Sequence, residues 1–161
     1  MNNNINKKIL LISLIFISLV LISAYVIEYK LGHKPCNLCI YERIPYFVSI
    51  LLIIETIFFK KNEKTTLLLL SLVFFISACL AFYHFGIEQG FFKESLVCQN
   101  QNIAESLTKE QLLEELKNSN VSCKEVNFRI FGFSLATINT IFSLILSVIF
   151  LKLFLNYGKN Q

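Results

Sequence analysis

The stretch TTLLLLSLVFFISACLAFYHF, from Thr65 to Phe85, contains no Lys, Arg, Asp or Glu over 21 residues. A helix of about 20 predominantly apolar residues is long enough to cross the hydrocarbon core of a bilayer. Lipid offers the backbone no hydrogen-bonding partners, so a segment that crosses it must satisfy its own N–H and C=O groups as a helix. The sequence therefore predicts a membrane-spanning helix at residues 65–85.

Three other segments, at residues 9–27, 44–59 and 131–155, are also predominantly apolar. Hydrophobic residues make up 55% of the chain and the mean hydropathy is +0.60, which is too apolar for an ordinary soluble domain. We therefore expect an all-α membrane protein, a four-transmembrane-helix bundle that forms a single domain over residues 1–161. Polar loops at about 28–43 and 86–130 would lie on one side of the membrane, and both termini on the other.

The first apolar segment follows Lys7 and Lys8, as the apolar region of a signal peptide would. It is longer than the usual 7–15 residues of such a region, so we expect a retained membrane helix. Positive charge is densest at the two termini and in the linker at 60–64, and the positive-inside rule then predicts cytoplasmic termini. The net charge of +4 lies beside the helices and forms no patch, so no nucleic acid partner is expected.

Four of the five cysteines lie in the two polar loops: Cys36 and Cys39 in the first, Cys98 and Cys123 in the second. Disulfides are common in oxidising compartments, so two inert bridges are one interpretation. A Cys-x-x-Cys bridge closes a very small loop and adds little stability, but this spacing is typical of redox-active pairs. We therefore predict a redox-active Cys36–Cys39 pair, with the following helix and Arg43 favouring a thiolate at Cys39.

The spacing of Cys98 and Cys123 leaves two interpretations open, a structural bridge or an exchangeable disulfide presented to a soluble partner. Four converging thiolates could bind zinc, but thiols in an oxidising compartment pair with each other, so we expect no metal. Cys79 lies inside an apolar segment and is expected to be a small core residue. Glu55 also lies in an apolar segment, close enough to its end for the carboxylate to reach the membrane surface.

The second loop is predicted to contain a short amphipathic helix. Residues 108–111, Thr-Lys-Glu-Gln, fit a capping box, and Leu107 and Leu112 are spaced as a hydrophobic staple. The helix should end near residues 118–120. It would lie either on the membrane surface or against its own loop.

Three stretches, in chain order, resemble the disulfide bond formation protein B (DsbB) family. KPCNLCIYER, residues 34–43, is similar to the signature of the family's first loop. YHFGIEQG, residues 83–90, resembles a motif of one branch of the family. Cys123 followed by FRIFGFSLA, residues 128–136, resembles the entry to its fourth helix. The resemblance extends from about residue 35 to residue 139.

The resemblance implies a four-helix protein of the bacterial inner membrane that reoxidises a DsbA-like periplasmic thiol oxidase and passes the electrons to a quinone, ubiquinone or menaquinone. Carried over by motif, Cys98 would be attacked by the partner and Cys123 would be its bridge partner. Electrons would pass to Cys36 and Cys39, with Cys39 facing the quinone. Arg43 would polarise a quinone oxygen.

Other interpretations remain open. His84 could approach the quinone or be only a polar residue at a helix end. The chain could be a DsbB paralogue dedicated to one client oxidase, or a non-enzymatic tetraspan scaffold with structural disulfides. A relative of vitamin K epoxide reductase is less well supported, because its Cys-x-x-Cys follows the loop cysteines in chain order. The chain has no Trp, where the family often has one, and Phe92 and Phe128 take that place.

Overall fold

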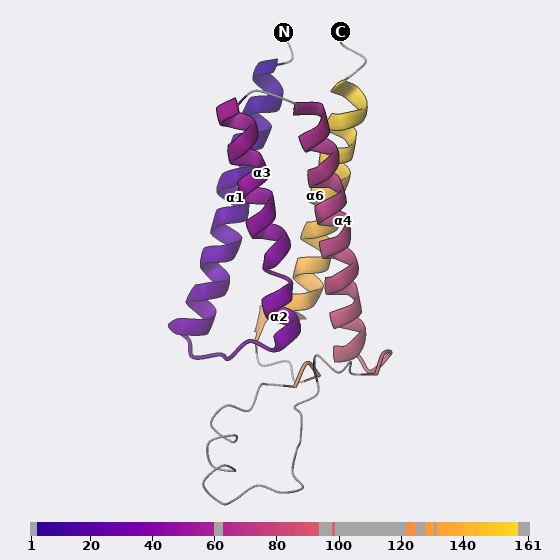
Figure 1. The fold of residues 1–161 in the computed structure, drawn as a ribbon. Helices are drawn as coiled ribbons and strands as arrows, with labels where there is room; N and C mark the ends of the chain where they lie inside the picture. Colours follow the sequence, from indigo (N-terminus) through magenta and orange to yellow (C-terminus); the bar gives the residue numbers. More distant parts are fainter. Residues whose placement is uncertain are drawn as a thin grey trace, which may run out of the picture.

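The computed structural model describes residues 3–59, 63–93, 98, 122–124, 128–130 and 132–157. Within this part of the chain, four spans are long and apolar enough to cross a membrane. They run side by side, with both termini at the same end (Figure 1). The spans are formed by α1 (Asn3–Tyr29), by α2 (Asn37–Tyr41) with α3 (Ile44–Phe59), by α4 (Glu63–Glu88) and by α6 (Leu135–Tyr157). The predicted four-helix membrane bundle is confirmed.

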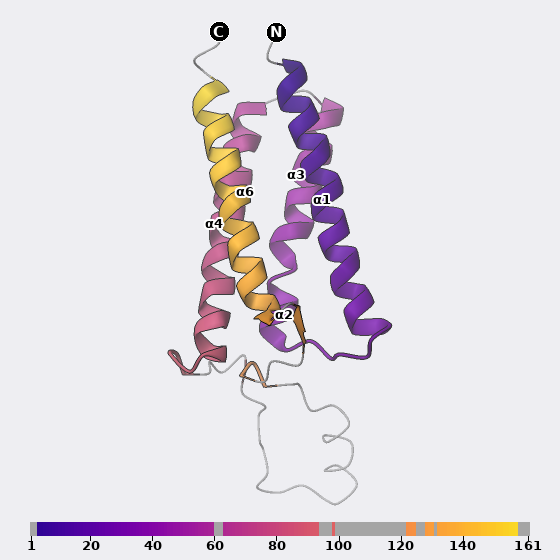
Figure 2. The ribbon, with the colours of Figure 1, turned by 180° about the vertical axis from the view of Figure 1, so that it is seen from behind.

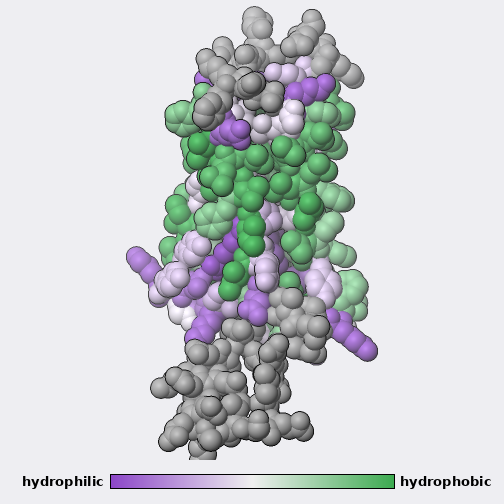
Figure 3. Space-filling model, in the orientation of Figure 1, coloured by the Kyte–Doolittle hydropathy of each residue, from purple (hydrophilic) through white to green (hydrophobic). Residues whose placement is uncertain are grey.

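The helices pack most extensively as α4 against α6, while α3 contacts both α1 and α4. Figure 2 shows α1 and α6 facing the viewer on opposite sides of the bundle. The core between the helices contains large, fully buried side chains, including Ile17, Ile53, Phe74 and Phe150. Hydrophobic residues also form a broad band on the face of the bundle that Figure 3 shows, as expected for a surface that faces lipid.

The second span is divided into two helices at Glu42 and Arg43. Cys36 caps the first of these, α2, because its sulphur accepts a hydrogen bond from the backbone N–H of Cys39 at 3.3 Å. Pro45 lies in the first turn of α3. Backbone N–H groups there have no partner within the helix, so the N–H that proline lacks costs no hydrogen bond. The Cys-x-x-Cys motif therefore lies on a short helix of its own, at the end of the bundle opposite the termini (Figure 1).

A small hairpin precedes α6. Strand β1 (Arg129–Ile130) pairs antiparallel with β2 (Phe133–Ser134), and Gly132 between them has a φ of +87°, in the region that favours glycine. Ser134 then accepts a hydrogen bond from the N–H of Thr137 at 3.2 Å, as a helix cap does. The fourth span therefore begins at Leu135, four residues after the start that its hydropathy predicted.

The expected burial of Cys79 is wrong, because its side chain is exposed on the surface of α4. Ser77 and Ala78, its neighbours in sequence, are the residues that face the core. Glu55 is exposed on α3. The predicted amphipathic helix near residues 108–120 lies outside the described residues.

Candidate redox centre

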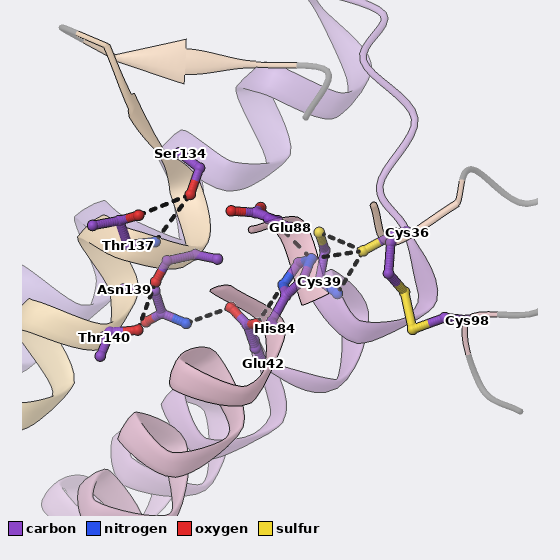
Figure 4. A network of polar contacts seen from close by, with 12 residues as sticks. Cys36, Cys39, Glu42, His84, Glu88, Cys98, Ser134, Thr137, Asn139 and Thr140 are labelled. Carbon is purple, nitrogen blue, oxygen red and sulfur yellow. Dashed lines mark hydrogen bonds and ion pairs between the residues drawn. A yellow bond between two sulfur atoms is a disulfide. The ribbon is translucent and has the colours of Figure 1, made fainter. Parts of the chain in front are cut away.

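Three of the four loop cysteines lie in one buried cluster, and the fourth, Cys39, is partly buried against it. Cys98 and Cys123 form a disulfide, and Cys36 and Cys39 are free thiols. Cys36, Cys98 and Cys123 are each at most 5% exposed and pack together with Ile87 of α4, while Cys39 packs against their cluster. Figure 4 shows the disulfide beside Cys36. Residues that are 25 and 3 positions apart in sequence therefore form two neighbouring cysteine pairs.

The two free sulphurs lie 2.8 Å apart, and the Cys36 sulphur is also 3.5 Å from Nε2 of His84. The hydrogen bond with Cys39 and the neighbouring His84 lower the pKa of the Cys36 thiol from 9.0 to about 5, although burial raises it. Cys36 is therefore the favoured thiolate, whereas the sequence led us to expect it at Cys39. The backbone N–H of Cys39 points at the sulphur of Cys36, and Arg43 is engaged with a carboxylate elsewhere.

His84 is held from its other side by a buried polar chain. Its Nδ1 lies 2.7 Å from Oε1 of Glu42, and Oε2 of Glu42 accepts a hydrogen bond from the side-chain amide of Asn139 at 2.6 Å. The amide oxygen of Asn139 accepts a hydrogen bond from the hydroxyl of Tyr46. The Glu42 carboxylate therefore joins His84 of α4 to Asn139 of α6 (Figure 4). Tyr46 of α3 holds Asn139 in turn.

Sequence reasoning did not identify Glu42, Asn139 or Tyr46 as parts of the site. Glu42 lies inside the stretch that carries the resemblance, directly before Arg43. Asn139 is a polar residue in a predicted membrane segment, where such residues often have a function. The position of Asn139 inside a membrane segment could therefore have identified it as part of the site.

Glu88, at the end of α4, lies on the Nε2 side of the same histidine, opposite Glu42. One carboxylate oxygen is 3.8 Å from Nε2 of His84. The other oxygen is buried and has no hydrogen-bond partner among the described residues. A buried oxygen without a partner is unfavourable, so this position has the character of a binding site.

A cavity of about 350 Å³ opens from the cysteine pair into the bundle. Its apolar walls come mainly from α1 and α6, and include Leu21, Ala24, Ile27, Ile138 and Phe142. Its polar end is formed by Cys36, Cys39, Arg43, His84 and Glu88 with Asn139. A ligand in this cavity would have one end against the thiols and the rest against hydrocarbon side chains.

Arg43 lies at the wall of this cavity in a fixed position. Its guanidinium donates a hydrogen bond to Glu28 of α1 at 2.5 Å and lies 4.9 Å from the ring centroid of Tyr25. Both contacts tie the start of α3 to the end of α1. A guanidinium has five N–H donors, so others are available to a ligand.

The sequence matches the family model of the disulfide bond formation protein DsbB over residues 6–153. An uncharacterised protein of Rickettsia prowazekii (strain Madrid E) is 31% identical over 157 residues, which cover 96% of this chain and 91% of that protein. No solved structure matches the chain. The family match extends over all four spans and both cysteine pairs of the site described above. The chain therefore belongs to the DsbB family of membrane proteins that act in disulfide bond formation.

Proposed function

We propose that the protein is a quinone-dependent protein thiol–disulfide oxidoreductase that reoxidises a DsbA-like periplasmic dithiol oxidase. One observation carries the proposal. Cys36 packs with the Cys98–Cys123 disulfide on one side and lines the 350 Å³ cavity with Cys39 on the other. This packing supports the transfer of electrons from the Cys98–Cys123 pair to Cys36 and Cys39 and from there into the cavity.

The proposed relay has two thiol–disulfide exchanges, which precede the transfer of electrons to the acceptor. A thiolate of the reduced partner attacks Cys98, which releases Cys123 as a thiolate, and the partner's second thiol then completes its own disulfide. The Cys98–Cys123 dithiol next reduces the Cys36–Cys39 disulfide by the same exchange. Each exchange moves two electrons and makes as many S–S bonds as it breaks.

The acceptor in this proposal is a membrane quinone, which takes up two electrons and two protons to become a quinol. A DsbA-like oxidase has a potential near −120 mV, so its reoxidation needs a strong electron acceptor. The cavity fits a quinone, since about 350 Å³ lies within the range of small-molecule sites and the walls are apolar. Cys39 and Arg43 both line it, which supports electron transfer from Cys39 and a hydrogen bond from Arg43 to a carbonyl oxygen.

His84 also lines the cavity, but its two ring nitrogens face Cys36 and Glu42. This arrangement supports an interaction of His84 with the Cys36 thiol and not with the quinone. The Cys36 thiol is already ionised near neutral pH, and Nε2 of His84, 3.5 Å from its sulphur, is the nearest group to hold the proton that the thiol has released. Glu42 would stabilise the imidazolium that results.

We further propose that the protein lies in the bacterial inner membrane with both termini in the cytoplasm. Both termini lie at the end of the bundle away from the cysteines (Figure 1), and Lys7 and Lys8 are close to the N-terminus. This orientation exposes the cysteine end to the periplasm, where the partner oxidase would be. A C-terminal alkaline phosphatase fusion should be inactive, and an active fusion would show the opposite orientation.

The decisive experiment uses purified protein in detergent, with a reduced DsbA-like protein and a soluble ubiquinone or menaquinone analogue. We expect quinone absorbance to fall with wild type and to stay constant with Cys39→Ser and with Cys98→Ser. Cys79→Ser is the matched control, because this exposed thiol lies outside the cluster and its loss should leave the rate unchanged. Absence of turnover with every quinone would refute the proposal and favour a dedicated paralogue or a scaffold.

A further inference from the structure

We propose that the protein in its reduced state binds a divalent metal ion of the zinc type through Cys36, Cys39, His84 and Glu88. The donor atoms of Cys36, Cys39 and His84 all lie within 4.8 Å of one another. Two thiolates, one imidazole and one carboxylate form a donor set that suits tetrahedral Zn²⁺. This set differs from the four-thiolate site considered from the sequence, because Cys98 and Cys123 are joined in a disulfide.

The distance between the Cys36 sulphur and the His84 nitrogen matches that of a tetrahedral site, whereas the two sulphurs are too close. With Zn–S near 2.3 Å and Zn–N near 2.0–2.1 Å, a sulphur and a nitrogen on one ion should lie about 3.6 Å apart. The observed distance from Cys36 Sγ to His84 Nε2 is 3.5 Å. The two sulphurs, 2.8 Å apart, would have to separate by about 1 Å on binding. Repulsion between two thiolates favours that change.

In this proposal Glu88 supplies the fourth ligand after a movement of its side chain, because only Cys36, Cys39 and His84 already converge and the Glu88 carboxylate also interacts with Ser134. The Glu88 side chain is 6% exposed, and Oε1 lies 3.8 Å from Nε2 of His84. Its Oε2 is buried without a hydrogen-bond partner among the described residues. A cation next to this carboxylate would satisfy it, as buried charges usually are satisfied in proteins.

The surroundings of His84 match those of a metal-binding histidine. Such a histidine usually donates its second ring N–H to a carboxylate, which orients the ring and leaves the other nitrogen free to bind the metal. Glu42 holds Nδ1 of His84 at 2.7 Å, and Nε2 faces the two sulphurs. Asn139 fixes Glu42 in turn at 2.6 Å.

The redox state of the cysteine pair would control this site. Only thiolates bind the ion, and binding releases the thiol protons to solvent. When the pair is a disulfide, both sulphur ligands are lost, and His84 and Glu88 alone are too few for a tetrahedral site. A bound ion would therefore keep the pair reduced and stop its electron transfer, a consequence that rests on the proposed function.

The test is an anaerobic titration of the full-length reduced protein in detergent with Co²⁺, followed by Zn²⁺. We expect one Co²⁺ per chain, with a thiolate-to-cobalt charge-transfer band and the intense visible bands of tetrahedral Co²⁺, both removed by Zn²⁺. Cys36→Ser and His84→Ala should abolish the bands. Glu42→Gln should weaken Zn²⁺ binding about 10–100-fold, the usual effect of losing such a supporting carboxylate. Cys79→Ser should bind as wild type does.

Two results would overturn the inference: no tetrahedral bands in the reduced protein, or equal bands in the oxidised protein or in the His84 variant. If His84→Ala does not fold, Glu42→Gln and Glu88→Gln decide the question. Unchanged Zn²⁺ affinity in both would refute the site. The titration contains neither quinone nor partner, so its result is independent of the turnover experiment.

Discussion

The carboxylate of Glu42 lies 2.7 Å from Nδ1 of His84, and the opposite nitrogen of that ring lies 3.5 Å from the sulphur of Cys36. This order, carboxylate to imidazole to thiol, connects α4 to the segment that carries the cysteine pair. It resembles the general arrangement in which a base activates a thiol and a third group orients the base. The Glu42 carboxylate should therefore control the thiol through His84.

We expect Glu42→Gln to raise the pKa of the Cys36 thiol. In wild type this pKa is lowered to about 5, first by the hydrogen bond with Cys39 and then, against burial, by His84. The thiolate therefore forms as the pH rises through about 5 and persists above it. A neutral amide stabilises the imidazolium less, and a charge-assisted hydrogen bond is worth about 1.5–3 kcal/mol. The thiolate-to-thiol ratio at a fixed low pH should fall at least about tenfold.

Ultraviolet thiolate absorbance of the reduced protein, followed against pH in a Cys79→Ser background, measures this midpoint. Glu55→Gln is the control, because it removes an exposed carboxylate from α3 without touching His84. An unchanged midpoint in Glu42→Gln would show that Glu42 has no effect on Cys36.

Arg43→Gln should weaken quinone use while leaving the cysteine cluster intact. The guanidinium lines the cavity, and Glu28 and Tyr25 hold it in place. Loss of a charged donor to a carbonyl oxygen, about 1.5–3 kcal/mol, should raise the KM for quinone at least about tenfold. Arg43→Lys should recover only part of this, because an ammonium lacks the planar fork of donors.

Steady-state kinetics at varied quinone concentration measures the KM of Arg43→Gln. Arg129→Gln is the control, because Arg129 is exposed on β1. Equal KM values for Arg43→Gln and wild type would exclude a contact between Arg43 and quinone. The Cys98–Cys123 bridge should remain closed in both variants by thiol trapping.

The apolar walls of the cavity provide a test of where quinone binds. Ala24 of α1 lines the cavity, and Ala24→Phe should fill part of its 350 Å³. We expect a higher KM for quinone but an unchanged pKa of Cys36. Ile22→Phe on the same helix is the matched control, since Ile22 is exposed and does not line the cavity. If both variants behave like wild type, quinone binds elsewhere.

Hydropathy alone identified the four spans, because each needs an apolar run long enough to cross the bilayer. Hydropathy did not show which face of a helix lies inside, since helices in lipid are apolar all round. That is why Cys79 was assigned to the core although its side chain is exposed. It also gave no sign of the hairpin before α6, because the second strand of that hairpin lies inside the apolar segment at 131–155.

The redox centre was only partly foreseeable for a related reason. The Cys-x-x-Cys motif is local, so the sequence located Cys36 and Cys39 directly. Contacts between distant segments are different: His84 is 48 residues from Cys36, and Asn139 is 97 residues from Glu42. Their meeting depends on how α4 packs against both α3 and α6, which no local pattern encodes. The lowered pKa of the Cys36 thiol depends first on the local hydrogen bond with Cys39, and then on one of these distant contacts, the one with His84.

Gly86→Ala should destabilise the end of α4 that supports the cluster. Inside a helix, Ala is normally up to about 1 kcal/mol more favourable than Gly. Here a methyl group on residue 86 would overlap the ring of Phe92, which stacks on Tyr83 at 5.6 Å between ring centroids. The carbonyl of Gly86 also accepts hydrogen bonds from the N–H groups of Phe91 and Phe92, at 2.8 and 3.1 Å. The ring therefore cannot move away without loss of its stacking.

Thermal unfolding in detergent should show a lower free energy of unfolding for Gly86→Ala, because overpacking costs about 1–3 kcal/mol and so outweighs the gain in helix propensity. Phe92→Ala removes the obstacle, so in that background Gly86→Ala should be neutral or stabilising, by helix propensity. Phe91→Ala is the control, because its side chain is 76% exposed. If the effect of Gly86→Ala is the same in all three backgrounds, the overlap with Phe92 is not its cause, because only residues that interact depart from additivity.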